Sequence, residues 1–217
     1  MLALLTSLKQ ICNHPAHYLD DGSALDGRSA KLEAFDDLID SASEARSDDR
    51  SEPTLVFTQY VVMAKLLASH LSERGISHAI LHGSLSPTER QRLTDEFQAG
   101  HIDVLVCSLR AAGTGLTLTR ATQVIHYDRW WNPAVEDQAT DRAHRIGQTA
   151  TVSVHRLISE GTLEERVAEV LGQKRQLAGA VMGTGVDGWI GGLNDGELGE
   201  LLRRQRPGGA ASSEDAA

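Results

Sequence analysis

The sequence predicts an α/β fold, a three-layer αβα domain whose sheet is mainly parallel. Short runs rich in β-branched residues, such as 104–107 and 124–127, are typical of strands buried on both faces of a sheet. Segments with helical spacing of apolar residues separate these runs, and such alternation favours right-handed crossovers between parallel strands. A chain of 217 residues with 41% hydrophobic residues is long enough for one such domain with a sizeable core.

The expected elements follow from capping residues and from apolar periodicity. We expect helices over 2–11, from 29 onward, over 60–74 and 86–99, from 132 to about 147, and from 162 onward; strands are expected over 54–58, 77–81, 104–107, 124–127 and 152–158. The clearest helix start is a capping box of Ser86 and Glu89, with Pro87 at the first helical position. Thr162 and Glu165 form a second pair of this kind.

The first helix has four apolar residues at helical spacing, and we expect it to pack on the domain through them. They are Leu2, Leu5, Leu8 and Ile11. We divide the chain into an N-terminal helix and loop at 1–28, a lobe at 29–178, an extension at 179–205 that holds a candidate last helix, and a disordered tail at 206–217.

The net charge of −9 argues against binding nucleic acid through bulk electrostatics. Acidic residues concentrate at 36–52 and after 160, whereas arginines recur beside the polar motifs. These arginines are Arg90, Arg92, Arg110, Arg120, Arg129, Arg142 and Arg145. A local basic strip on an acidic protein therefore stays open.

Two cysteines, Cys12 and Cys107, do not suggest a disulfide framework and fit a reducing cytosol. The first residues lack the early basic region of a signal peptide, and no stretch is long enough to span a bilayer. We expect a cytoplasmic protein with no membrane partner. Cys12, His14 and His17 lack a second ligand pair at zinc-site spacing, so we expect a structural turn there and no metal site.

Polar residues follow the two central strands at their carboxyl ends. Ser108 and Arg110 follow the first strand, and Asp128 follows the second. In open α/β sheets ligands bind in the crevice beyond these ends, so both groups should face one ligand site. Gly113 and Gly115 suit close approach of backbone N–H groups to a phosphate, although glycine alone is equally compatible with a plain turn.

The helix expected after residue 132 has three polar residues on one face. Gln138, Arg142 and Arg145 are spaced i, i+4 and i+7, and two guanidiniums with one amide match phosphate oxygens. The alternative is a solvated face with pairs to Glu136 and nearby aspartates. The position directly after the second strand's polar end favours a functional site.

The run SLRAAGTGLTLTRATQVIHYDRWWNPAVEDQATDRAHRIGQ resembles motifs V, Va and VI of the Swi/Snf-type DNA-dependent ATPases, a branch of the superfamily two helicases. LVFTQY resembles motif IV, LHGSLSPTER resembles the motif that follows it, and the likeness continues through VHRLISEGTLEERV. It extends from residue 2 to about 177. The resemblance implies the second RecA-like lobe, of P-loop NTPase type, in a two-lobed motor of bacterial type.

On this resemblance, ATP binds in a cleft between another lobe and this one, with Arg142 and Arg145 as arginine fingers and Gln138 as the residue that orients them. Gly113, Gly115 and Asp128 are assigned to the nucleotide side. The chain contains no GxxxxGK[ST] loop and no strand-terminal Asp-Glu pair, so Mg²⁺ should be held mainly by an N-terminal ATPase lobe of the same protein.

The resemblance also assigns seven residues to the backbone of double-stranded DNA. They are Thr58, Gln59, His82, Gly83, Ser84, Ser108 and Arg110. Taken singly, Thr58 and Gln59 could equally cap a helix, and a histidine after a strand is more often structural.

The implied task is ATP-dependent translocation on DNA and remodelling of a DNA-bound protein target, associated with the nucleoid. The isolated chain is expected to be inactive. One alternative is a non-catalytic nucleic-acid or protein interaction module that kept the lobe and lost the motor. Another is a free-standing nucleotide-dependent enzyme of doubly wound fold, which the missing phosphate loop disfavours.

Overall fold

A five-stranded parallel sheet forms the middle layer of the computed structural model, which describes residues 2–44, 52–108, 118–130, 133–143, 148 and 150–169. The strand order is β2-β3-β1-β4-β5. The strands are β1 (Thr54–Thr58), β2 (His78–Leu81), β3 (Val104–Ser108), β4 (Gln123–His126) and β5 (Ser153–Arg156). All four pairings between them are parallel, which confirms the predicted fold class.

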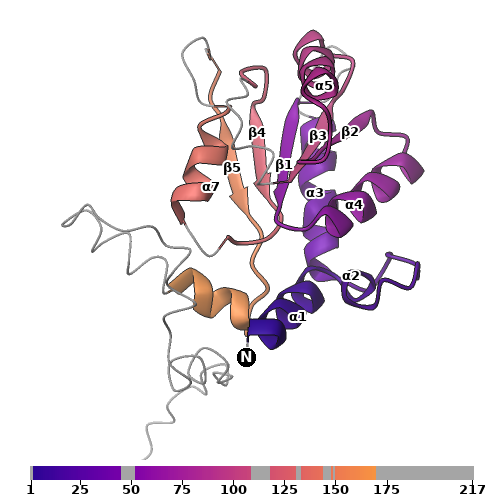
Figure 1. The fold of residues 1–217 in the computed structure, drawn as a ribbon, viewed down its shortest axis with the longest axis vertical. Coiled ribbons are helices and arrows are strands. Elements are labelled where there is room, and N and C mark those ends of the chain that lie inside the picture. The colour runs from indigo at the N-terminus through magenta and orange to yellow at the C-terminus, as the bar shows by residue number, and fades with distance from the viewer. Residues whose placement is uncertain are drawn as a thin grey trace, which may run out of the picture.

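The helices are α1 (Leu2–Asn13), α2 (Pro15–Leu19), α3 (Ala30–Glu44), α4 (Val61–Glu73), α5 (Pro87–Ala99), α7 (Pro133–Thr140) and a helix at 163–169. Figure 1 shows α1 beside that last helix at one end of the molecule, although they are far apart in sequence. The predicted extension at 179–205 and tail at 206–217 lie outside the described residues.

Alternate residues of the strands build two cores, one on each face of the sheet. Leu55 and Phe57 of β1 face a core that includes residues of α5 and α7. Val56, between them, faces a core with residues of α3 and α4. Because side chains alternate along a strand, a strand buried on both faces requires helices on both sides, and Figure 1 shows this three-layer arrangement.

The strand register brings the carboxyl ends of four strands to one edge of the sheet. Thr58 of β1 lies opposite Ser108 of β3, while Phe57 lies opposite His126 of β4. Leu81 of β2 lies opposite Cys107. The polar residues that follow these strands therefore meet at this edge, as the sequence predicted.

The predicted helix start at Ser86 is confirmed. The Ser86 hydroxyl accepts a hydrogen bond from the Glu89 N–H at 3.2 Å, and the Glu89 carboxylate accepts one from the Ser86 N–H at 3.1 Å. The second predicted box differs: Thr162 accepts from the Glu164 N–H, but the Glu165 carboxylate accepts from Gly161. Thr162 therefore caps the first turn of the helix at 163–169, while Glu165 of that helix binds the N–H of the residue before Thr162.

The buried face of α1 differs from the predicted apolar stripe. Ile11 is 44% exposed, whereas Leu5, Lys9 and Asn13 are buried. These three are spaced i, i+4 and i+8 and share one face. The two polar side chains are buried because they donate hydrogen bonds to the loop that follows β4.

Helix α7 ends earlier than predicted, at Thr140 instead of near residue 147. The Asp141 N–H still donates to the carbonyl four residues back, but Arg142 and Ala143 donate to carbonyls three residues back. The Arg142 carbonyl accepts from the Leu118 N–H at 3.0 Å, so it is bonded outside the helix. The chain therefore turns away at this point.

None of the helices in the described ranges is long and apolar enough to cross a membrane.

Replacing Ser86 with alanine should lower the free energy of unfolding by about 1 kcal/mol, because the first turn of α5 loses its side-chain cap. Urea denaturation of the chain measures this change. Thr88→Ala is the control: Thr88 lies two residues further on and is also exposed, and its loss should lower the free energy of unfolding by less. Equal costs for the two variants would contradict a capping role for Ser86.

Candidate functional site

A groove of about 600 Å³ lies at the carboxyl edge of the sheet, and we call it the rim groove. It gathers residues from α1, α2 and α4, from the end of β3, and from the segments that follow β1, β2 and β4. Its lining is Thr6, Gln10, His17, Gln59, Tyr60, Val61, Val62, His82, Gly83, Ser84, Ser108 and Trp130. Five of the seven residues predicted to contact DNA are in this set. Of the other two, Thr58 is absent from the lining and Arg110 lies outside the described residues.

The turn after β2 presents its backbone to solvent and is held by the side chain of Arg90. Gly83 and Ser84 are exposed, and the Ser84 hydroxyl lies 2.7 Å from Nδ1 of His82. The Arg90 guanidinium donates to the carbonyl of Gly83 at 2.7 Å and to that of Leu85 at 3.0 Å. A Cβ atom at Gly83 would meet nothing within 4 Å, so the lobe alone does not require glycine there. Because Gly83 has no side chain, this part of the groove stays open to a ligand.

The carboxylate of Asp128 is fully buried at the end of β4 and joins three elements. It accepts hydrogen bonds from the Thr58 hydroxyl at 2.5 Å and from the Gln59 side chain at 2.8 Å. The Gln59 N–H and the Asn13 side chain donate to it as well. Thr58 is also fully buried. This burial does not support direct ligand contacts for Thr58 or Asp128. Asp128 instead holds Gln59 at the groove, and Thr58 donates to Asp128.

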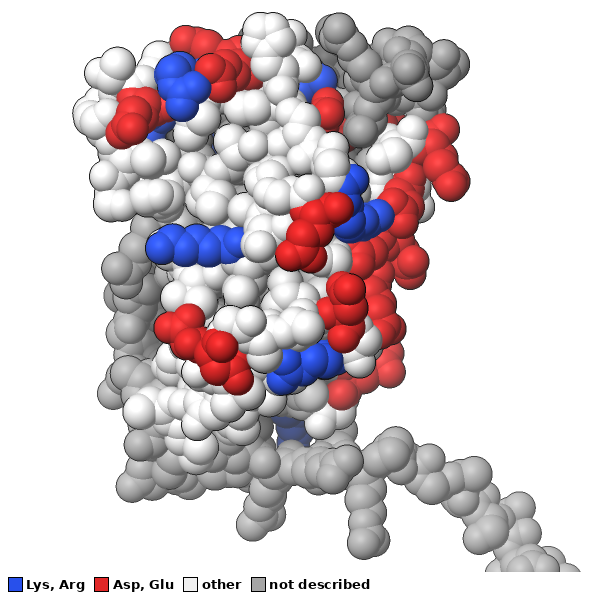
Figure 2. Space-filling model, turned by 90° about the vertical axis from the view of Figure 1, so that its right-hand side faces the viewer, with Lys and Arg blue, Asp and Glu red and all other residues white. Residues whose placement is uncertain are grey.

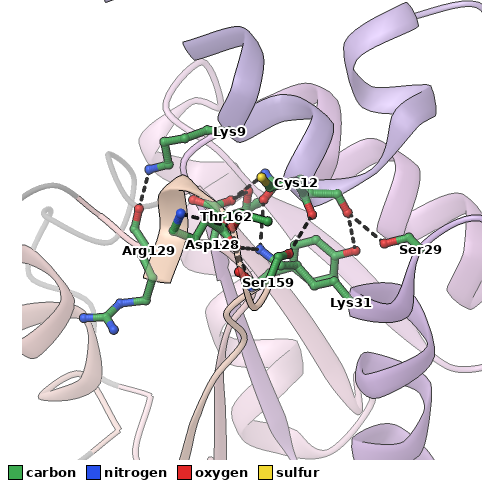
Figure 3. A network of polar contacts seen from close by, with 12 residues as sticks. Lys9, Cys12, Ser29, Lys31, Asp128, Arg129, Ser159 and Thr162 are labelled. Atoms are coloured by element: carbon green, nitrogen blue, oxygen red, sulfur yellow. Dashed lines mark hydrogen bonds and ion pairs between the residues drawn. The ribbon is translucent and has the colours of Figure 1, made fainter. Parts of the chain in front are cut away.

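A second buried network lies beside Asp128, and Figure 3 shows how its residues converge from separate elements. Lys31 of α3 forms an ion pair with Glu164, and its ammonium lies 5.8 Å from the centre of the Tyr127 ring. The Tyr127 and Ser29 hydroxyls both donate to the Asn13 carbonyl at 3.1 Å. These contacts fasten α1 and α3 to the loop after β4 and to the helix at 163–169.

Sequence reasoning missed the contribution of α1 to this edge. Thr6 and Gln10 of α1 line the rim groove, and Lys9 and Asn13 bind the loop beyond β4. The available signal was the pair of polar residues at i and i+4 that follows Leu5 on one helix face.

On α7, the predicted shared face of Gln138 and Arg142 is wrong, because Gln138 is exposed whereas Arg142 is only 5% exposed. The turn after Thr140 moves Arg142 off the helix face. Gln138 is therefore open to solvent, whereas the rest of the lobe covers most of the Arg142 side chain. Arg145, Gly113 and Gly115 lie outside the described residues.

The arginines that the structure describes do not form the basic strip that the sequence left open, because several of them bind groups of the lobe itself. Arg120 donates to the carbonyls of Phe97 and Ile102, and Arg129 donates to Glu136 at 2.9 Å. Arg92 pairs with Glu96. On the face shown in Figure 2, acidic residues gather along one margin and basic residues are scattered. No broad basic surface is formed by the described residues on this face.

The rim groove contains a buried histidine without a hydrogen-bond partner for either ring nitrogen, His17, which is 3% exposed. Its ring lies edge-on to that of Tyr60, with centroids 4.7 Å apart. Burial lowers the pKa of His17 to about 4 and that of His126 to about 3. Both imidazoles are therefore neutral at pH 7.

Fold and groove together define a class: a parallel α/β lobe with a ligand edge at its carboxyl strand ends and no phosphate loop of its own. The chain belongs to the helicase conserved C-terminal domain family, which it matches over residues 30–147, and is a lobe of the SWI2/SNF2 type.

Solved and curated relatives agree with this assignment. The chain resembles the Sulfolobus solfataricus SWI2/SNF2 ATPase C-terminal domain with 35% identity and a TM-score of 0.73, covering 94% of this chain and 82% of that one. It resembles the S. solfataricus SWI2/SNF2 ATPase core in complex with dsDNA with 39% identity and a TM-score of 0.76, covering 94% and 42%. YwqA of Bacillus subtilis (strain 168), whose name refers to ATP-dependent helicase/translocase activity, is 45% identical over 93% of this chain and 22% of its own length.

The chain spans about a fifth of the length of the curated relatives it matches.

Stability should fall on acidification because His17 and His126 are neutral in the folded lobe. Their folded pKa values lie below the ordinary 6.5, so the unfolded chain binds more protons between about pH 6.5 and 4. Their stabilising contribution is complete above pH 6.5 and is lost as the pH falls. His17→Phe should remove about 1.4 kcal/mol per pH unit of this slope. Denaturation at pH 7 and pH 5 measures it, and an unchanged slope would contradict the protonation account.

Proposed function

We propose that this chain is the second motor lobe of an ATP-dependent translocase that moves on double-stranded DNA and remodels DNA-bound proteins. The observation that carries the proposal is the rim groove, which collects Gln59, the turn at 82–84 and Ser108 at the ligand edge of the sheet. Support comes from a relative of the same fold that was solved in complex with dsDNA.

The DNA backbone is the ligand proposed for the rim groove. The polar groups of the groove are side-chain amides, hydroxyls and the exposed backbone of the turn at 82–84. Such groups bind phosphate and sugar without reading bases. A net charge of −9 makes a long electrostatic contact unfavourable, so few local contacts fit better. Tracking along DNA without sequence preference follows from contacts of this kind.

The nucleotide side is proposed at the end of α7. Arg142 and Arg145 would act as arginine fingers toward ATP held by an N-terminal lobe of the same protein, and Gln138 would orient them. Gly113 and Gly115 would let their loop close on the nucleotide. Mg²⁺ would be held mainly by the N-terminal lobe. ATP supplies the free energy for closing and opening the two lobes on the DNA.

Burial decides how Arg142 can take part. Its 5% exposure means that lobe closure or nucleotide binding must draw it from its present position, or that Arg145 is the main finger. Asp128 fits a nucleotide contact poorly, since Thr58, Gln59 and Asn13 already occupy its carboxylate. We propose instead that Asp128 acts by holding the groove in shape.

The burial of Arg142 also favours a second candidate, a non-catalytic interaction module that kept the lobe. The two differ in one respect: the complete protein hydrolyses ATP only if it is a motor. The isolated chain should be inactive in either case, because it contains no phosphate loop.

In the complete protein, Arg145→Ala should lower DNA-stimulated ATP hydrolysis by about 10³-fold or more, the range lost with an arginine finger. Steady-state phosphate release with saturating duplex DNA measures the effect. Arg92→Ala removes an exposed arginine of α5 and serves as the control, with near-normal turnover. Near-normal turnover for Arg145→Ala would remove the finger assignment, and an inactive wild-type protein would remove the motor.

A further inference from the structure

Lys9 is a fully buried lysine on α1, outside the residues that match the family. Its ammonium donates to the carbonyl of Arg129 at 2.5 Å, in the loop directly after β4. Figure 3 shows the ammonium meeting the backbone of Arg129 while the guanidinium extends away on the other side. Lys9 thus holds the main chain of this loop and leaves the arginine side chain free to bind elsewhere.

Burying this lysine is costly, which a helix-packing role alone does not explain. Burial is the largest influence on Lys9 and lowers its pKa to about 8, while the charge of Asp128 opposes this shift. An apolar residue of similar length would pack α1 on the lobe without that cost. A buried cation at this position therefore points to a use for its charge and its hydrogen bond.

The contact continues from Lys9 to α7. The Arg129 guanidinium donates to Glu136 at 2.9 Å, and the Trp130 N–H donates to the same carboxylate oxygen at 2.7 Å. Arg156 of β5 lies 3.6 Å from the other oxygen of Glu136. Glu136 is fully buried on α7, so the first turn of this helix is placed by residues 129 and 130.

The same loop also borders the rim groove. Gln59, which lines the groove, donates to the Arg129 carbonyl at 2.5 Å alongside Lys9. Trp130 lines the groove directly. Residues 128–130 therefore touch both the proposed DNA groove and the helix that leads to the proposed arginine fingers.

The Arg129 carbonyl, which Lys9 binds, and the Asp128 carboxylate, whose charge acts on it, both have other donors. The Arg129 carbonyl keeps its bond from Gln59, and the Asp128 carboxylate keeps those from Thr58, Gln59 and Asn13. Removing the ammonium leaves neither group without a donor, so the lobe should still fold. What is lost is the tie between α1 and the loop, together with a positive charge near Asp128.

We propose that Lys9 is a positioning residue for ATP hydrolysis: by holding the Arg129 carbonyl, it sets Glu136 and α7, and so couples the DNA groove to the catalytic arginines. The inference rests on the proposed motor function. Small displacements of a catalytic group lower the rate without loss of binding, so the variant's defect belongs in kcat.

The test compares Lys9→Met with wild type in the complete protein. We expect kcat of DNA-stimulated hydrolysis to fall about 10-fold, a modest misplacement effect. The Kd for a duplex oligonucleotide and the KM for ATP should stay within about threefold. Lys65→Met, which removes an exposed lysine of α4, is the matched control and should keep wild-type kcat. Wild-type kcat for Lys9→Met, or equal loss of DNA binding and kcat, would overturn the proposal.

A double-mutant cycle with Glu136→Gln tests the route through α7. If Lys9 acts through Glu136, the kcat of the double variant should be no lower than that of the more impaired single variant. A kcat in the double variant that equals the product of the two single losses would contradict this route.

Lys9→Gln keeps a hydrogen-bond donor on a shorter side chain and is the variant to measure should Lys9→Met fold poorly. Its kcat should lie between those of Lys9→Met and wild type, and a wild-type kcat would overturn the proposal. An inactive wild-type protein would instead refute the motor itself.

Discussion

The buried carboxylate of Asp128 is the interaction on which the carboxyl edge of this lobe depends. A carboxylate without solvent contact is stable only when donors surround it, and here Thr58, Gln59 and Asn13 supply them from β1, the turn after it and α1. The strand ends are thereby locked together, and α1 becomes part of the domain. The rim groove takes its shape from this requirement, because Gln59, which lines it, is bonded to both Asp128 and the Arg129 carbonyl.

A second buried carboxylate, Glu136, extends the same principle to α7. It accepts hydrogen bonds from the Arg129 guanidinium and from the Trp130 N–H. The carbonyl of Arg129 is the group to which Lys9 and Gln59 donate. Hydrogen bonds in a low-dielectric interior are strong, and a polar network whose members are bonded is rigid. On the proposed motor function, this connection would link DNA binding at the rim groove to the position of α7.

The sequence predicted most elements of the fold because the signals were local. The β-branched runs of the strands and the capping box at Ser86 each involve residues only a few positions apart. The groove was predicted in part, since strand ends of a parallel sheet must meet. The burial of Thr58, Asp128 and Arg142 was not predictable, and neither was the polar buried face of α1, because periodicity gives a direction within one element but not its partner on another. Lys9 and Arg129 are 120 residues apart.

Amide hydrogen exchange of the complete protein, with and without duplex DNA, tests most directly whether the rim groove is the surface that meets DNA. The Gln59 and Trp130 N–H groups are bonded to buried carboxylates and should exchange slowly in both states. The exposed turn at 82–84 should exchange fast in the free protein and slow down when DNA binds. Unchanged exchange at 82–84, with slowing confined to a distant surface such as α3, would contradict the account.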